Sequence, residues 1–239
     1  MARYTLFYII FLLSYNLFGQ NVRPNADLIF DLNDEIGNEV LYSKYANDSL
    51  SKNIETIRFV GFDSIPNKFI LFKNVNTIIL ESSDVNGLDI FPLLETLYLI
   101  ESGKINEQES WLKRIKKLNI HKTYSIEGIT SFKNIPLLEE LVLSYSGFYD
   151  FPSNIDSLKN IKKIIWAVYT GTKIDLSLID LNKIPSLKEL EVISWSNNII
   201  GIPIGIKNSH LQRLKIQHPN LTPEEKRNLL GANQKMKQR

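Results

Sequence analysis

Apolar residues recur along this chain in a six-residue pattern whose first, fourth and sixth positions are apolar. Eight copies occur between residues 54 and 216, and their starts lie 21, 19, 21, 23, 23, 26 and 24 residues apart. The copies are IETIRF (54–59), VNTIIL (75–80), LETLYL (94–99), IKKLNI (115–120), LEELVL (138–143), IKKIIW (161–166), LKELEV (187–192) and LQRLKI (211–216). Such a period indicates a repeat architecture, in which each unit is buried only by stacking on its neighbours.

Each hexamer predicts a short strand with three apolar side chains facing inward. The apolar positions of residues 138–143 should stack on those of residues 161–166, so that successive strands become parallel neighbours around one continuous core. After each strand the chain must return along the other side of the core. In the unit that follows residue 143, the predicted inward anchors of this return are Phe148, Phe151, Ile155 and Leu158.

This pattern resembles the leucine-rich repeat, whose unit runs L-x-x-L-x-L-x-x-N/C-x-L over about 20–29 residues. The resemblance covers residues 54–216. It implies an α/β fold, a leucine-rich repeat solenoid with a curved parallel β-sheet of about eight repeats. The convex side would be irregular or carry short helices, and short helical caps would close both ends.

The chain departs from the family pattern at the ninth position, where asparagine or cysteine usually bonds the exposed backbone after the strand. The residues here are Phe62, Ser83, Ser102, Thr123, Ser146, Tyr169, Trp195 and Pro219. We expect the four hydroxyl residues to replace that hydrogen-bond ladder in part, and the curvature to be irregular toward both ends. The long unit 161–186 has spare chain, which predicts a convex bulge or a short helix.

Residues 1–20 have the build of a secretory signal peptide: an early positive charge at Arg3, an apolar run over residues 6–13, and Gly19 before a polar stretch. We expect cleavage near Gly19 and Gln20. An uncleaved anchor is the alternative, although the run is shorter than the roughly 20 residues that a spanning helix needs. Export would place the protein in the periplasm, at the cell surface or outside the cell.

The remaining segments predict a capped repeat domain, because an open end of a stack would expose the core. Residues 21–53 are predicted to form an N-terminal cap, residues 54–219 the repeats, and residues 220–239 a C-terminal helix with a basic tail. The N-terminal cap should bury one helical face that carries Ile36, Val40 and Leu41. The helix signals at the C-terminal end are Thr222 as N-cap, Pro223, Glu225 and the terminating Gly231.

Composition narrows the possible chemistry. The 239 residues are 44% hydrophobic and 23% charged, with a net charge of +2 and no cysteine, so thiol catalysis and sulfur-based zinc sites are excluded. The near balance of charge argues against nucleic acid as a partner. The three histidines lack metal-ligand spacing, and no phosphate-binding or nucleophile-elbow motif occurs. We therefore expect that the protein is not an enzyme and that it binds no cofactor and no metal ion.

Paired carboxylates at Glu139 and Glu140 could suggest hydrolytic catalysis. They stand at the second and third positions of their hexamer, and the matching positions of the flanking hexamers are residues 116–117 and 162–163, all lysine. Adjacent strands lie about 4.8 Å apart, so these charges should alternate across the sheet and form ion pairs. This pairing also leaves the lysines less free to bind a phosphate backbone.

Apolar residues at outward positions point to a binding surface on the concave face. The candidate partner-binding residues are Tyr98, Ile100, Val142, Tyr145, Ile165, Ala167 and Ile193. A contiguous exposed apolar strip between charged rows is typical of an interaction site. Two alternatives remain: these residues follow β-propensity alone, or a loop or the N-terminal segment covers them.

The resemblance implies noncatalytic protein–protein recognition through the concave face. Glycan or cell-wall binding is the alternative, because Tyr145, Tyr169 and Trp195 occupy similar offsets of successive repeats and could stack on sugars. The segments outside the repeats are too short for a separate catalytic domain. The absence of cysteine-rich caps favours an exported bacterial protein.

Overall fold

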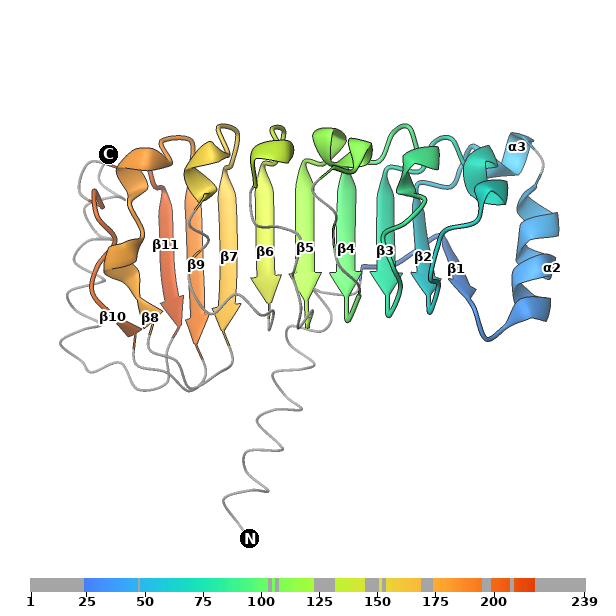
Figure 1. Ribbon diagram of the computed structural model, residues 1–239, viewed down its shortest axis with the longest axis horizontal. Helices are drawn as coiled ribbons and strands as arrows, with labels where there is room; N and C mark the ends of the chain where they lie inside the picture. Colours follow the sequence, from blue (N-terminus) through green and yellow to red (C-terminus); the bar gives the residue numbers. More distant parts are fainter. Residues whose placement is uncertain are drawn as a thin grey trace, which may run out of the picture.

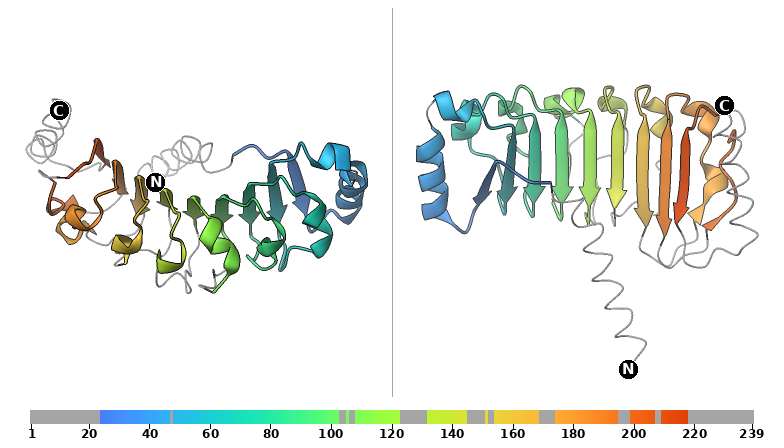
Figure 2. Two further views of the ribbon diagram at one scale, coloured as in Figure 1. Left: turned by 90° about the horizontal axis from the view of Figure 1, so that it is seen from above. Right: turned by 180° about the vertical axis from the view of Figure 1, so that it is seen from behind.

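The computed structural model describes residues 24–46, 48–102, 105, 108–122, 132–144, 151, 154–168, 174–194, 199–206 and 209–217. Nine strands form one sheet in the order β1-β2-β3-β4-β5-β6-β7-β9-β11, and every neighbouring pair is parallel. Short 3₁₀ helices return the chain along the other side (Figure 1). Seen from above, the strands line the inner side of a shallow arc and the 3₁₀ helices its outer side (Figure 2). The fold is a leucine-rich repeat solenoid, as predicted.

The elements are short and evenly spaced. The strands of the main sheet are β1 (Leu28–Asp31), β2 (Thr56–Val60), β3 (Thr77–Glu81), β4 (Thr96–Ile100), β5 (Lys117–His121), β6 (Glu140–Ser144), β7 (Lys163–Val168), β9 (Glu189–Ser194) and β11 (Arg213–Gln217). The 3₁₀ helices are η1 (Asn67–Leu71), η2 (Leu88–Ile90), η3 (Ser110–Arg114), η4 (Phe132–Asn134), η5 (Ile155–Ser157), η6 (Leu176–Leu178) and η7 (Leu181–Lys183). Each hexamer therefore forms a strand, as its pattern predicts.

The inward positions of the hexamers build the core. All of them are buried except Ile216, which is partly buried and packs against the same cluster. Leu141 lies level with Ile164 of the next strand, and Leu143 with Trp166. The strand register thus stacks the apolar ladder unit upon unit, and the burial of this ladder drives the fold.

The returns continue the apolar pattern with a period of three, which suits a 3₁₀ helix. In the first return Phe69 and Phe72 are both buried, and the Phe72 N–H donates to the Phe69 carbonyl at 3.0 Å. The same bond recurs between Leu158 and Ile155 at 3.1 Å. Of the predicted anchors, Ile155 and Leu158 are buried and Phe151 packs edge-on against Trp166, which confirms them. Phe148 lies outside the described residues.

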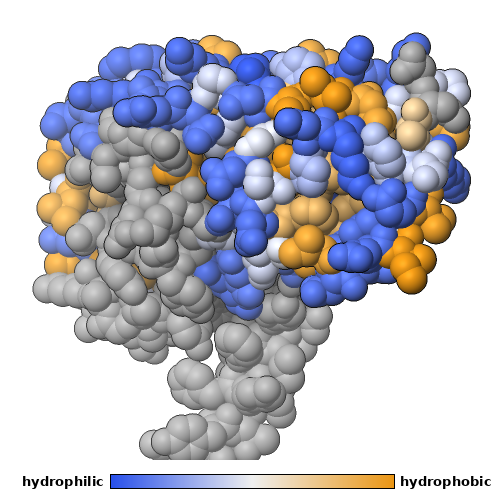
Figure 3. Space-filling view, turned by 45° about the vertical axis from the view of Figure 1, so that its right-hand side comes forward, coloured by the Kyte–Doolittle hydropathy of each residue, from blue (hydrophilic) through white to orange (hydrophobic). Residues whose placement is uncertain are grey.

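The N-terminal cap consists of β1, α2 (Glu35–Tyr45) and α3 (Asp48–Ser51), so a cap at this end is present. The predicted buried face of its helix is confirmed at Leu41 and wrong at Ile36 and Val40. Ile36 and Val40 are 81% and 64% exposed, whereas Tyr42 and Tyr45 pack with Leu41 against the core. The predicted face did not include Tyr42 and Tyr45. Because aromatic rings have a large apolar area, the side of α2 that carries them turns toward the core. Exposed apolar residues consequently interrupt the hydrophilic surface near this end (Figure 3).

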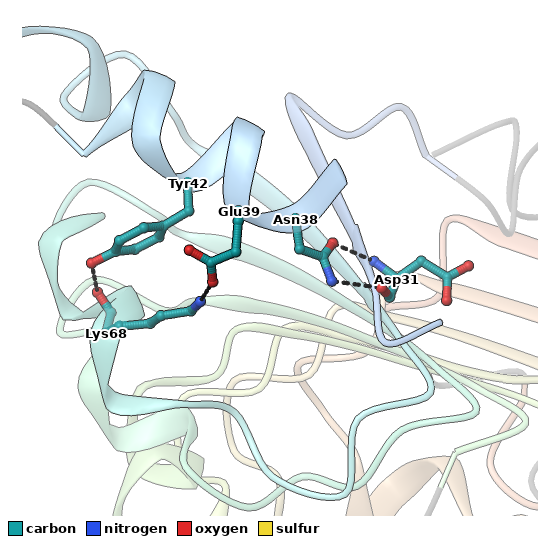
Figure 4. A network of polar contacts seen from close by, with 5 residues as sticks. All are labelled: Asp31, Asn38, Glu39, Tyr42 and Lys68. Atoms are coloured by element: carbon teal, nitrogen blue, oxygen red, sulfur yellow. Dashed lines mark hydrogen bonds and ion pairs between the residues drawn. The ribbon is translucent and has the colours of Figure 1, made fainter. Parts of the chain in front are cut away.

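Polar contacts attach α2 to the repeats (Figure 4). Tyr42 donates its hydroxyl to the Lys68 carbonyl, and Lys68 forms an ion pair with Glu39. Asn38 reaches Asp31 at the end of β1: its Oδ1 accepts from the Asp31 N–H at 3.0 Å and its Nδ2 donates to the Asp31 carbonyl at 2.6 Å. The cap is therefore bonded both to its own strand and to the first return.

The long unit at residues 161–186 contains the predicted short helices, η6 and η7, together with an additional strand. This strand, β8 (Ile174–Asp175), pairs in parallel with β10 (Ile199–Ile200) of the next unit. The Leu181 N–H also donates to the Ile204 carbonyl at 2.9 Å. A second, two-stranded sheet therefore forms beside the 3₁₀ helices at the C-terminal end.

Several sequence-based predictions fall outside the described residues. These are the signal peptide over residues 1–20, the C-terminal helix with Thr222, Pro223, Glu225 and Gly231, and ninth-position residues Thr123, Ser146, Tyr169, Trp195 and Pro219. They remain predictions. The described helices include none that is both long and apolar enough to cross a membrane.

Candidate functional site

The concave face is the face of the nine-stranded sheet that carries the third, fifth and seventh hexamer positions. Its centre is a row of side chains at the fifth position, one from each hexamer, which the parallel register places side by side. This fifth-position row consists of Arg58, Ile79, Tyr98, Asn119, Val142, Ile165, Glu191 and Lys215. It is charged at both ends and mostly apolar between them.

Three of the predicted partner-binding residues belong to this row and are partly exposed. Val142 and Ile165 lie directly opposite each other in β6 and β7, and Tyr98 follows on β4 beyond Asn119. Directly opposed side chains on one face of a sheet are about 5 Å apart, which makes Val142 and Ile165 one continuous apolar surface. Tyr145 lies outside the described residues.

For the other three predicted residues, the prediction of an exposed surface is wrong. Ile100, Ala167 and Ile193 are only 2%, 6% and 3% exposed. All three stand at the seventh position, and this position is buried in each strand of the main sheet from β4 to β9. Alternation along a strand decides the side on which a side chain lies, but it carries no information about what packs over that side.

Residues that pack over the concave side can be identified at Ile100. With Ile79 it forms a small apolar cluster apart from the main core, and Ala26 and Tyr98 pack against it. Ala26 belongs to the segment that precedes β1, which crosses the strand side of the sheet (Figure 2). The alternative that the N-terminal segment covers part of the strip is therefore confirmed at this end of the face.

Ion pairs flank the fifth-position row, and the predicted alternation of charge is confirmed. At the third position Lys117, Glu140, Lys163, Glu189 and Arg213 follow one another in register. The Lys163 Nζ lies 2.7 Å from Glu140 Oε1. At the second position the Lys162 Nζ lies 2.8 Å from Glu139 Oε2, and the Lys116 Nζ lies 2.6 Å from Glu95 Oε1.

These contacts decide the role of the adjacent carboxylates. Glu139 and Glu140 each bond a different lysine, so they act as two ion-pair partners in neighbouring rows. The hydrogen bond from Lys162 lowers the pKa of Glu139, slight burial opposes it, and the charges of Lys162, Lys116 and Lys117 lower the pKa further. Glu139 therefore remains ionised at neutral pH, which suits an ion-pair partner and not a proton donor.

Tyr98 adds an aromatic ring and a hydroxyl group to the fifth-position row. Burial raises the pKa of its hydroxyl, the negative charge of Glu140 raises it further, and the positive charge of Lys163 acts in the opposite direction. Because the ordinary pKa of tyrosine is already about 10, the hydroxyl is protonated at neutral pH with or without this shift. An apolar ring with a polar tip is a frequent anchor in protein interfaces.

Candidate metal ligands do not cluster in the part of the chain that the structure describes. No group of three or more His, Cys, Asp or Glu side chains there is arranged to hold a metal ion. His121 is buried within β5 at 7% exposure. The aromatic residues that suggest glycan binding, Tyr145, Tyr169 and Trp195, lie outside the described residues.

Comparison with known proteins finds similarity to solved structures. No protein-family model and no curated protein matches the sequence. A solved leucine-rich repeat protein of Leptospira interrogans aligns over 76% of this chain with 14% identity and a TM-score of 0.48. The aligned region spans 60% of the length of that protein.

Sequence reasoning missed two features of this face. Ile79 occupies the fifth position of its hexamer, as Tyr98 does, but the predicted strip began one strand later. The ion pair between Lys215 and Glu191, at 2.6 Å, closes the row at its other end. Reading every fifth position in register would have found both, whereas nothing in the pattern indicated the segment that covers Ile79.

Proposed function

We propose that this protein is a noncatalytic recognition scaffold that binds another protein through the concave face over β4–β7. Leucine-rich repeat folds commonly mediate protein binding, and solenoids in general use their concave surface for it. The observation that carries the proposal is the paired surface of Val142 and Ile165, partly exposed and in direct register. Tyr98 lies beyond Asn119 in the same row.

The surroundings of this surface support a protein partner. An apolar centre with a polar, charged rim is the usual anatomy of a protein interface. Here the ion pairs of Lys163 with Glu140 and of Lys162 with Glu139 form the rim on the N-terminal side of the strands. Because both signs of charge alternate there, the rim favours a partner of mixed charge over a polyanion.

Affinity capture with matched variants tests the site. Immobilised protein is exposed to extracellular and envelope proteins of its source, and retained proteins are identified by mass spectrometry and confirmed in purified form. Ile165→Asp should weaken binding of the confirmed partner by about tenfold or more, because it places a charge in the apolar centre. The control Ile70→Asp makes the same change at a 57% exposed isoleucine in η1 and should have no effect. Equal binding by all three proteins contradicts the proposal.

We also propose that the protein is exported by a signal peptide at residues 1–20. The basis is the sequence pattern of Arg3, the apolar run over residues 6–13 and Gly19. N-terminal sequencing of protein recovered from the cell envelope or the medium should place the mature end near Gln20. Recovery of the intact chain, starting at Met1, contradicts cleavage.

A further inference from the structure

The segment Pro24–Asp27 lies across the concave face ahead of β1, on the strand side of β2–β4 (Figure 2). At its end, the Asp27 carboxylate accepts from the N–H groups of Glu55 and Thr56 at 2.9 and 2.8 Å. The Asp27 N–H donates to the Thr56 carbonyl at 3.0 Å. This end of the segment is therefore fixed to the sheet by three hydrogen bonds.

The preceding residues are held much more weakly. The guanidinium of Arg58 donates from Nη2 to the Pro24 carbonyl at 3.2 Å, and the methyl group of Ala26 packs on the cluster of Ile79 and Ile100. Asn25 between them is exposed. Among the described residues, one hydrogen bond and one methyl contact hold this end, against three hydrogen bonds at Asp27, so we expect it to detach more readily than Asp27.

Ala26 of the segment packs on a pair of isoleucines whose burial is unusual for an outward face. Ile79 and Ile100 stand at fifth and seventh positions, on the same side of the sheet as Tyr98, yet they are 0% and 2% exposed. Two isoleucines at outward positions form an apolar surface that water would contact if the segment left. This surface adjoins Tyr98, and hence the proposed partner surface.

We propose that Pro24–Asp27 is an autoinhibitory segment, here called the strap, which occupies the part of the concave face over β2–β4. Its release would extend the partner surface to Ile79 and Ile100. This inference rests on the proposed function. The partner element that replaces the strap would be an extended peptide segment with a small apolar side chain over the two isoleucines. Its backbone carbonyl would accept from Arg58, as the Pro24 carbonyl does.

Thiol reactivity tests the strap without any partner, because the chain has no cysteine of its own. Ile100→Cys places a single thiol under the strap, and its rate of reaction with an aromatic disulfide reagent is measured. Adding Ala26→Asp, which puts a charge against the apolar cluster, should raise this rate by at least about tenfold. Adding Asn25→Asp, the same change at the exposed neighbouring residue, should leave the rate unchanged.

Two further cysteine positions separate strap release from unfolding. Leu97→Cys, in the core at 0% exposure, should react slowly with and without Ala26→Asp, and Ile70→Cys, at 57% exposure, should react fast in both. If the Ala26→Asp variant folds poorly, Ala26→Gly takes its place. This change removes only the methyl group, and it should give a smaller rise in the reaction rate of Ile100→Cys. The strap is overturned if neither change at residue 26 speeds the reaction, or if Leu97→Cys becomes reactive in step.

The partner experiment then tests the role of the strap. Ala26→Asp should raise binding of the confirmed partner by at least about threefold relative to Asn25→Asp. Equal or weaker binding overturns the regulatory role even if the thiol rates show release. Failure of the proposed function is distinct: Ile165→Asp would then bind normally, whatever the thiol rates show.

Discussion

The N–H of Ser83 donates to the hydroxyl oxygen of Ser102 in the next repeat, at 3.3 Å. The same Ser102 oxygen lies 2.9 Å from the Leu80 carbonyl and 3.0 Å from that of Ile100, to which the hydroxyl donates. Ser83 makes the equivalent contacts one repeat earlier, with the Phe62 N–H and the Phe59 and Glu81 carbonyls. At these two repeats serine therefore makes the ninth-position hydrogen bonds that asparagine makes in the usual leucine-rich repeat pattern, as predicted.

Removing the Ser102 hydroxyl should destabilise the protein. Ser102→Ala leaves the buried Ser83 N–H and the Leu80 carbonyl without this partner, and we expect the free energy of unfolding to fall by about 1–3 kcal/mol. Urea denaturation followed by circular dichroism measures the change. Ser64→Ala, at an exposed serine, is the control and should stay within about 0.5 kcal/mol of the parent protein. A Ser102→Ala variant as stable as Ser64→Ala would show that the ladder contributes little.

The alternating charges at the third position should set a modest part of the stability. Glu140→Lys places a third positive charge between Lys117 and Lys163, and we expect a loss of about 1 kcal/mol at low salt. The loss should shrink in 1 M NaCl, where screening acts over about 3 Å. Asp63→Lys changes the net charge equally at an exposed site and serves as the control. Equal losses in both variants would mean that net charge, not register, is responsible.

The lowered pKa of Glu139 gives a prediction about pH. Because Lys162 lowers this pKa in the folded state, the carboxylate contributes stability at pH values above its unfolded pKa. That contribution is lost as the pH falls through the folded pKa. NMR titration of the side-chain carboxyl carbon should show Glu139 ionising below the usual glutamate range, and Lys162→Gln should move it upward. Lys188→Gln, one strand further along, should leave it nearly unchanged.

Asn38 should protect the end of the first strand. Leu32 donates to the Val60 carbonyl of β2, so the alternation of the backbone turns the N–H of Asp31 away from β2, where Asn38 binds it. Asn38→Ala should lower the free energy of unfolding by about 1–2 kcal/mol and speed deuterium exchange at the Asp31 amide. Asn67→Ala, at an exposed asparagine of η1, is the control. Unchanged exchange at Asp31 would contradict this role.

The solenoid could be predicted from sequence because its period is a direct consequence of stacking. Leu138 and Ile161 recur at the same offset since each unit needs apolar side chains in the same three places to cover its neighbour. The charge rows followed from the same register: once Glu140 and Lys163 are assigned the same position, parallel pairing places them side by side. Repeat spacing thus determines both the core and the order of residues along each row.

Repeat spacing could not predict which outward side chains are exposed and which are buried by other segments. Val142 and Ile100 are both apolar residues at outward positions in the pattern, yet Val142 is partly exposed whereas Ile100 is buried and packs against Ala26 and Tyr98. The choice between the two sides of α2, where Tyr42 displaced Val40 from the core, was equally invisible.

The sequence by itself therefore determined the repeat, the inward residues and the charge ladders, because these depend on spacing alone. The tertiary structure decided which outward residues remain open, since that depends on contacts between segments far apart in the chain, such as residue 26 with residues 79 and 100. The sequence pattern predicts the repeated strands of the solenoid because they recur at a regular spacing. The cap and the strap do not recur, so only the tertiary contacts show how they pack.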